Sequence, residues 1–295
     1  MRTYLKYVLC FIGLVFITGC GTAQPINPSF ALTVDEARHA LTDMHDNKVT
    51  LKRPVIVAGG IGDPGVMASS LADQIEEIAD DGSVVEPVSF FGAGTFAECR
   101  ERLLEAVAEL PVELPDEKTD PATIEVDVIA ISMGGLVARY AAMPDEQGDD
   151  SRHIRIARLF TIASPHRGAN LADLPTLDSR VRAMRAGSDF LEQLNDHLSD
   201  AEYDLVPYVR LDDVIVGAEQ AAPPGESVWW LPNRVGEFAH LGAAADPRIV
   251  ADIARRLRDE KPFTSPPAQP LPGPDTDSAV PDTDATTGRA SANQS

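Results

Sequence analysis

Short apolar runs alternate along the chain with segments that have helical periodicity. Buried-type strands are predicted at 55–58, 84–91, 126–131 and 157–162. Helices are predicted at 63–79, 96–110 and 133–142. Strands that alternate with helices favour the α/β class, with a mostly parallel sheet and helices on both faces. Right-handed crossovers would bring the carboxyl ends of the strands to one edge, where sites of such folds form.

After residue 163 this alternation breaks. Residues 164–202 carry apolar positions in rough helical register, which predicts a small helical cap insertion. The earlier pattern then returns, with strands predicted at 205–211 and 228–231 and a last helix opened by Asp246 and Pro247. The α/β domain expected from this pattern spans residues 51–260.

The first twenty residues are typical of an export signal. A short basic region precedes the apolar stretch 7–17, which is too short for a comfortable membrane span. Small residues then lead to Cys20, and the run Ile17-Thr18-Gly19-Cys20 resembles a bacterial lipobox. The resemblance implies cleavage of a signal peptide, residues 1–19, and lipid on Cys20, so we expect an exported, membrane-anchored lipoprotein at the periplasmic side or the cell surface. An uncleaved anchor helix is the alternative.

The segments that flank the expected domain differ from it in composition. Residues 20–50 are predicted to be a lipidated tether followed by a helix, which the pair Thr33 and Glu36 opens as a capping box. Residues 261–295 are rich in Pro, Ser, Thr and Asp. Such a segment cannot bury enough apolar surface to fold, so a disordered tail is predicted.

Charge and cysteine content exclude several classes of function. The formal net charge is −21, and loss of the basic signal region would bring it to about −23. So acidic a chain argues against nucleic acid as a partner and against electrostatic docking on anionic lipid. Because Cys10 would leave with the signal and Cys20 would carry lipid, Cys99 has no partner for an intramolecular disulfide. Its helical surroundings predict a core position.

The most informative segment is 124–142, which reads I-E-V-D-V-I-A-I-S-M-G-G-L-V-A-R-Y-A-A. It predicts a strand, a sharp turn and a helix, with Ser132 at the apex. Ala130 and Gly134 are small enough for the crowded turn of a nucleophile elbow, of which A-x-S-x-G is a variant. Such a turn would expose the Ser132 hydroxyl and aim the Met133 N–H at a developing oxyanion. An ordinary strand-to-helix turn is the alternative.

An activated serine needs a base and an acid that orients the base, and in α/β-hydrolases these follow in the order Ser, Asp/Glu, His. Asp212 and Asp213 come at the end of the strand predicted at 205–211, and His240 lies in the loop after the last strand. Asp213 is preferred because D-V-I-V matches the D-x-x-V pattern of hydrolases of this type, while Asp212 stays open. The remaining histidines are expected to be structural or solvated: His39, His45, His153, His166 and His197.

The loop after the first strand, A-G-G-I-G-D-P-G, has two interpretations. Its Ile61 N–H would complete an oxyanion hole with that of Met133. Residues 60–65 also satisfy G-x-G-x-x-G, the pattern of dinucleotide-binding folds. That second interpretation requires an acid at the end of the next strand, where residues 89–91 are Ser-Phe-Phe.

Together with the elbow, A-S-P-H-R-G at 163–168 and S-D-F-L-E-Q-L-N at 188–195 resemble the lipase and esterase branch of the α/β-hydrolases. The likeness is to triacylglycerol lipases and inositol-deacylase-like lipases, over roughly residues 54–257. The chain departs from many such lipases at Gly59-Gly60, where they carry His-Gly, and at Ala130, where the elbow usually opens with Gly.

The resemblance implies a serine hydrolase that cleaves carboxylic esters of small molecules or lipids, with Ser132, Asp213 and His240 as catalytic triad and with no metal or cofactor. By analogy with lipase lids, the 164–202 insertion would cover the site and offer its apolar face to an acyl chain. A non-catalytic binding lipoprotein that keeps the fold is the alternative from another class, and a dinucleotide-binding protein is a further one.

Overall fold

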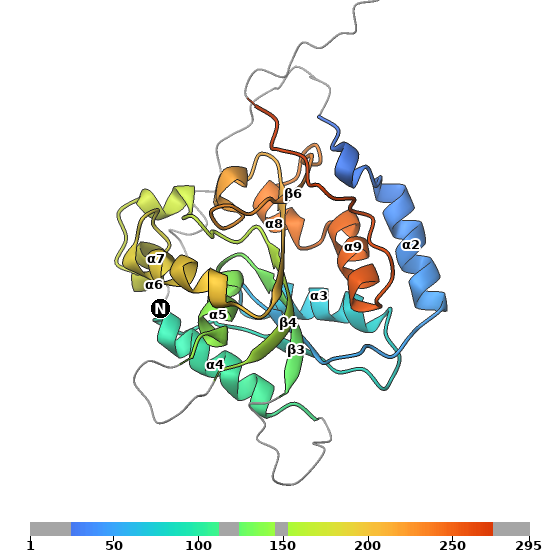
Figure 1. Ribbon diagram of the computed structural model, residues 1–295, viewed down its shortest axis with the longest axis horizontal. Helices are drawn as coiled ribbons and strands as arrows, with labels where there is room; N and C mark the ends of the chain where they lie inside the picture. The colour runs from blue at the N-terminus through green and yellow to red at the C-terminus, as the bar shows by residue number, and fades with distance from the viewer. Residues whose placement is uncertain (1–24, 112–123, 145–152, 274–295) are drawn as a thin grey trace, which may run out of the picture. The chain divides into compact units, whose positions relative to one another are not determined.

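The computed structural model describes residues 25–111, 124–144 and 153–273. Its centre is a six-stranded sheet in the spatial order β2-β1-β3-β4-β5-β6, in which every neighbouring pair is parallel (Figure 1). The strands are β1 (Val55–Ala58), β2 (Val85–Val88), β3 (Glu125–Ile131), β4 (Arg155–Ile162), β5 (Asp204–Arg210) and β6 (Trp229–Leu231). The predicted α/β class is confirmed.

Helices cover both faces of the sheet, as the alternating pattern predicts (Figure 1). On one face lie α2 (Val34–Asp46), α3 (Val66–Glu76) and α9 (Pro247–Leu257). On the other face lie α4 (Phe96–Ala108), α5 (Met133–Ala142), α6 (Ser179–Ala183) and α7 (Asp189–Asp196), while α8 (Ala239–Ala243) lies against β5. Short 3-10 helices complete the connections at Pro28–Phe30, Asn170–Asp173, His197–Asp200 and Ala218–Gln220.

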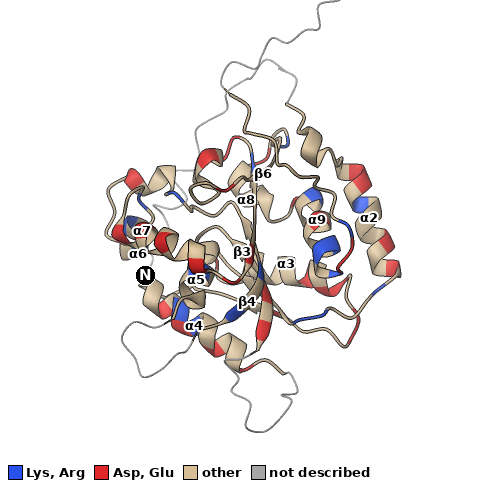
Figure 2. Cartoon of the chain, viewed as in Figure 1, with Lys and Arg blue, Asp and Glu red and all other residues tan. Residues whose placement is uncertain are grey.

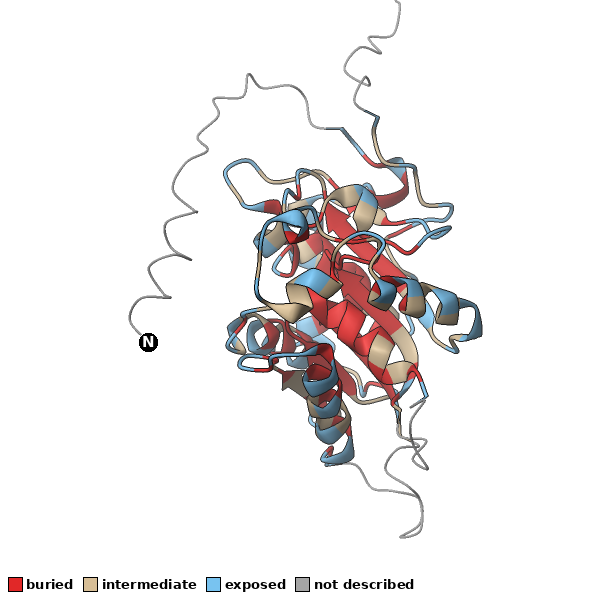
Figure 3. Cartoon of the chain, turned by 90° about the vertical axis from the view of Figure 1, so that its left-hand side faces the viewer, coloured by how far each residue is buried: buried red, intermediate tan, exposed pale blue. Residues whose placement is uncertain are grey.

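The strands divide their side chains between two apolar cores, because successive side chains of a strand point to opposite faces. Val55 and Val57 of β1 pack in the core beneath α3 and α9, whereas Ile56 and Ala58 pack in the core beneath α4 and α5. All four are completely buried. Figure 3 shows the buried sheet between helices whose outer sides are exposed. A strand buried on both faces has a nearly continuous apolar sequence. This explains why β1 and most of β3 could be predicted from the sequence.

The folded unit extends beyond both boundaries predicted from the sequence, because it runs from Ile26 to Leu271. At the N-terminal side, the ring of Phe30 lies 6.2 Å from that of Tyr208, and the predicted capping box of Thr33 opens α2, which packs against α9. At the C-terminal side, Thr264 is buried and its N–H donates to Asp252. Residues 26–50 and 261–271 are therefore part of the domain.

The predicted signal peptide, Cys20 and most of the predicted tail lie outside the described residues. Within the described ranges, no helix is both long enough and apolar enough to cross a membrane. Figure 2 shows that acidic residues occur along α2 and in several other segments of the chain.

The predicted cap insertion packs beside α5. The ring of Phe190 in α7 lies 4.2 Å from that of Phe96 in α4 and 5.5 Å from that of Tyr140 in α5. Arg139 of α5 donates from Nη2 to the Leu194 carbonyl oxygen at 2.6 Å, and Leu194 itself is buried. The apolar face of α7 is therefore used for packing inside the domain, and the expectation that this face would meet an acyl chain was wrong.

Candidate active site

The turn between β3 and α5 has the strained backbone of an elbow. Ser132 adopts φ 53° and ψ −122°, directly between Ile131 at the end of β3 and Met133 at the start of α5. A positive φ is uncommon for a residue with a side chain, and it persists only where the surroundings impose it. Here the Ser132 N–H donates to the Ile162 carbonyl oxygen at 2.8 Å, which ties the turn to the end of β4.

Backbone from the neighbouring strand crowds the turn at Gly134. A Cβ atom at this position would lie 2.6 Å from the Gly59 carbonyl oxygen and 2.7 Å from that of Ala58. Ala130, on the other side of the turn, is completely buried. The close approach of β1 and its loop therefore requires a glycine at position 134.

We expect Gly134→Ala to destabilise the folded domain by about 1–3 kcal/mol or more, because backbone atoms cannot move aside as a flexible side chain could. The free energy of unfolding in urea measures the effect. Gly94→Ala is the matched control, since its nearest contact would be Glu98 Oε2 at 3.6 Å. Equal stability of the two variants would contradict this account of the turn.

A chain of hydrogen bonds joins three side chains from the segments that follow β3, β5 and β6, and His240, expected in a loop, lies in the short helix α8. His240 Nε2 lies 3.1 Å from Ser132 Oγ, and His240 Nδ1 lies 2.8 Å from Asp213 Oδ2. Because a carboxylate only accepts, Nδ1 carries the proton and Nε2 is free to accept from the serine hydroxyl. The structure thus brings together the three residues that are predicted from the sequence to be nucleophile, acid and base.

The structure brings Asp213, and not Asp212, to the histidine. Asp212 adopts φ 64° in the turn after β5 and is exposed. Asp213 is buried, and its Oδ1 accepts from the N–H groups of Ile215 and Val216, both at 3.0 Å. These two bonds fix the carboxylate so that Oδ2 faces His240.

Two backbone amides lie free beside the serine. A Cβ atom at Gly60 would be 3.3 Å from Ser132 Cβ, which places the loop after β1 against Ser132. In the part of the chain that the structure describes, no hydrogen bond uses the N–H of Ile61 or of Met133. Met133 is the first residue of α5, and the first amides of a helix have no partner within it. The helix dipole adds partial positive charge at the same place.

The position of this site follows from the sheet order. β1 lies between β2 and β3, and the helices that follow β1 and β3 pack on opposite faces of the sheet. The loops that leave these two strands therefore diverge, and the crevice between them is where open α/β sheets bind ligands.

Asp63 occupies the helix terminus that the dinucleotide interpretation requires. Its Oδ1 accepts from the N–H groups of Gly65 and Met67, and its Oδ2 accepts from that of Ala68, all at 3.1 Å. A pyrophosphate in a dinucleotide-binding fold uses such amides at the start of the helix. Because a buried carboxylate already fills this place, the alternative loses its binding site.

His166 has a structural role beneath α5, where its side chain is completely buried. Its Nδ1 accepts from Arg139 Nη1 at 3.1 Å, so Nε2 carries the proton that it donates to Thr161 Oγ1 at 3.0 Å. Burial, and then the positive charges of Arg139 and Arg167, hold the pKa of His166 well below its usual range. This imidazole is therefore neutral and anchors α5 from within the domain.

Other candidate residues also lie apart from Ser132. His39 and His45 are exposed on α2, and Cys99 is completely buried, as predicted. His197 makes a local contact with the Gln193 carbonyl oxygen. Among the described residues, no group of three or more His, Cys, Asp and Glu side chains could hold a metal ion.

Comparisons with known proteins show likeness at low sequence identity. A family model described as a domain of unknown function, DUF7379, matches residues 101–182. No curated protein sequence matches the chain. The structure is similar to that of the lipase BlEst2 from Bacillus licheniformis in its mature form, with 14% identity, a TM-score of 0.46, and coverage of 73% of this chain and 93% of that one.

Two further solved structures are similar over part of their length. The propeptide form of the same lipase has 14% identity and a TM-score of 0.45, and the match covers 65% of this chain and 47% of that one. The phospholipase PlaB from Legionella pneumophila, in complex with thio-NAD, has 15% identity and a TM-score of 0.47, with 70% and 58% covered. The chain thus spans about half the length of these two relatives. The matched family segment holds Ser132, while Asp213 and His240 lie beyond it.

Proposed function

We propose that this protein is a serine hydrolase that cleaves carboxylic esters. The observation that carries the proposal is the hydrogen-bonded chain from Asp213 through His240 to Ser132, at the carboxyl edge of the sheet. A serine hydroxyl bonded to a neutral imidazole, itself oriented by a buried carboxylate, is the arrangement that activates serine for acyl transfer. A protein that only binds a ligand would not need all three groups in this order.

The geometry supports a two-step reaction. His240 Nε2 takes the proton of Ser132 as Oγ attacks the acyl carbonyl carbon, and the same nitrogen then gives the proton to the leaving alcohol oxygen. Asp213 holds the imidazole in its tautomer and stabilises the cation. The N–H groups of Ile61 and Met133 would donate to the oxyanion. Water then attacks the acyl-serine with His240 as base, which releases the acid and restores the hydroxyl.

Exposed apolar side chains around the site support a substrate with an apolar acyl part. The described residues include ten exposed large apolar side chains, and nine of them follow the carboxyl end of a strand. These nine are Val66, Phe91, Leu171, Leu174, Leu177, Val214, Val235, Phe238 and Leu241. Because the strands are parallel, the connections that carry these side chains all begin at the edge that holds Ser132. Exposed apolar surface that gathers at one place marks a binding region.

A fluorophosphonate probe, which reacts covalently with activated serines, tests the proposal. We expect it to label the purified protein, with the label on the peptide that contains Ser132. A panel of esters, thioesters and amides of increasing acyl length then defines the reaction. Absence of labelling in the folded protein would favour the non-catalytic alternative, and equal turnover across acyl lengths would contradict the apolar acyl part.

We further propose that the protein is exported and anchored through lipid on Cys20. The support is the lipobox-like run that ends at Cys20, and the folded domain begins soon after it, at Ile26. Cys20→Ala is expected to move the protein from the membrane fraction to the soluble fraction, because no acyl chain can then be attached. Unchanged membrane association of the variant would overturn the anchor.

A further inference from the structure

A completely buried cation lies at the end of the strand that leads to the acid. Arg210 is the last residue of β5, three residues before Asp213, and none of its side chain is exposed. Burial of a guanidinium is costly unless it is paired. Among the described residues, the charged partners of Arg210 are Glu237 and Asp246, which belong to the segment that carries His240, far away in the sequence.

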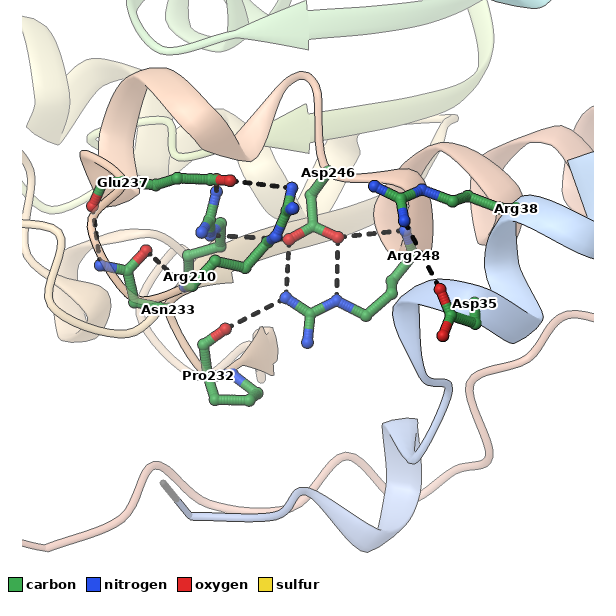
Figure 4. Close-up of polar contacts among 9 residues, drawn as sticks. Asp35, Arg38, Arg210, Pro232, Asn233, Glu237, Asp246 and Arg248 are labelled. Carbon is green, nitrogen blue, oxygen red and sulfur yellow. Dashed lines mark hydrogen bonds and ion pairs between the residues drawn. The ribbon is translucent and has the colours of Figure 1, made fainter. Parts of the chain in front are cut away.

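Two polar contacts join Arg210 to that segment (Figure 4). Its Nη1 donates to Glu237 Oε2 at 2.9 Å, and its Nε lies 3.5 Å from Asp246 Oδ2. A Cβ atom at Gly242 would lie 2.3 Å from Nη1, so the backbone of α8 rests directly on the guanidinium. Glu237 precedes His240 by three residues and Gly242 follows it by two. The cation therefore contacts the chain on both sides of the base.

Beside the imidazole, α8 itself buries only the small side chains of Ala239 and Ala243. α8 has only five residues and no side-chain cap, and Phe238 and Leu241, which flank the base, are 63% and 56% exposed. Asn233 Nδ2 donates to the Glu237 carbonyl oxygen at 3.1 Å, which stabilises the turn locally. Further along, Arg248 holds Asp246 with two bonds, at 2.9 and 2.7 Å. Figure 4 shows Asp246 between Arg210 and Arg248.

We propose that Arg210 is a positioning residue for the hydrolase reaction, acting through Glu237 to hold His240 against both Asp213 and Ser132. Arg210 and Asp213 leave the same strand end, so the ion pair fixes the distance between the acid and the segment that carries the base. The inference rests on the proposed function, because it assigns a role to Arg210 and Glu237 in that same site.

Glu237→Ala tests the inference in the full chain, with Arg234→Ala as matched control. Arg234 Nη1 contacts the other oxygen of the same carboxylate, Glu237 Oε1, at 2.9 Å, and both side chains are 34% exposed. We expect Glu237→Ala to lower kcat about 10- to 100-fold with KM changed by less than about twofold, because small misplacement of a catalytic group has effects of this size. Arg234→Ala should stay within about twofold of wild type in both constants.

Two readouts separate positioning from a purely structural role. Glu237→Gln keeps an oxygen that accepts from Arg210 Nη1, so it should recover most of the kcat that Glu237→Ala loses. The downfield proton resonance of His240 Nδ1–H, bonded to Asp213, should broaden or shift in Glu237→Ala and not in Arg234→Ala. Turnover is measured well below the unfolding midpoint of each variant, so that loss of folded protein does not enter the comparison.

A kcat of Glu237→Ala within twofold of wild type, with an unchanged Nδ1–H resonance, would overturn the inference. A loss that Glu237→Gln does not recover at all would also overturn it, because it would not depend on the contact to Arg210. If the wild type itself shows no turnover and no fluorophosphonate labelling, the proposed function fails instead. The Nδ1–H resonance still tests the positioning in that case.

Discussion

Ser132→Ala is expected to lower ester turnover by about 10,000-fold or more while the domain stays folded. The variant keeps the Cβ atom and the backbone of the elbow, and it removes only the Oγ atom that lies 3.1 Å from His240 Nε2. The remaining amides and binding surface cannot replace the covalent step. Turnover of a chromogenic ester, fluorophosphonate labelling and the thermal unfolding midpoint are the three measurements.

Ser164→Ala is the matched control for this loss. Ser164 is buried after the end of the neighbouring strand β4, it follows a residue with a positive φ, Ala163, and its Oγ makes no hydrogen bond within the described residues. Removal of this hydroxyl should leave turnover within a few fold of wild type. If Ser132→Ala retained turnover comparable to that of Ser164→Ala, the proposed nucleophile would be wrong.

Asp213→Asn is expected to lower kcat by about 10,000-fold with little loss of stability. Asparagine has nearly the same shape, but its amide can donate to the imidazole and thereby favour the tautomer whose Nε2 carries the proton. That tautomer cannot accept the Ser132 proton. The effect should appear in kcat, because the substrate does not contact this buried side chain.

The adjacent aspartate provides the comparison. Asp212 is exposed with φ 64°, a conformation that asparagine tolerates well. Asp212→Asn should therefore match wild type in kcat and in thermal stability. A larger loss in Asp212→Asn than in Asp213→Asn would reverse the assignment that the hydrogen bonds favour.

Features encoded over a few neighbouring residues could be predicted from the sequence. The elbow is one, because the apolar strand, Ser132 and the small residues around it stand next to one another. The α/β class is another, because strands buried on both faces read as continuous apolar runs. Asp213 and His240 could be selected because each follows a predicted strand, in the order Ser, Asp, His that the resemblance implies.

Features that depend on contacts distant in the sequence could not be predicted. Arg210 and Glu237 are 27 residues apart, and an arginine at a strand end can equally face solvent, so no local pattern distinguishes a buried pair. A charged residue closing an otherwise apolar strand just before the acid was the available signal. The extent of the compact unit, from Ile26 to Leu271, depends on similar contacts, since single residues such as Phe30 and Thr264 are buried although the segments around them are polar.

The bond from Arg139 to α7 limits how this molecule can change shape. Swinging α7 away would leave a buried guanidinium without the Leu194 carbonyl oxygen and without Asn195 Oδ1, which it also contacts at 3.1 Å. That cost makes α7 a fixed part of the domain and not a hinged cover. Separating α7 from α5 would therefore cost both these bonds and the ring contact between Phe190 and Tyr140.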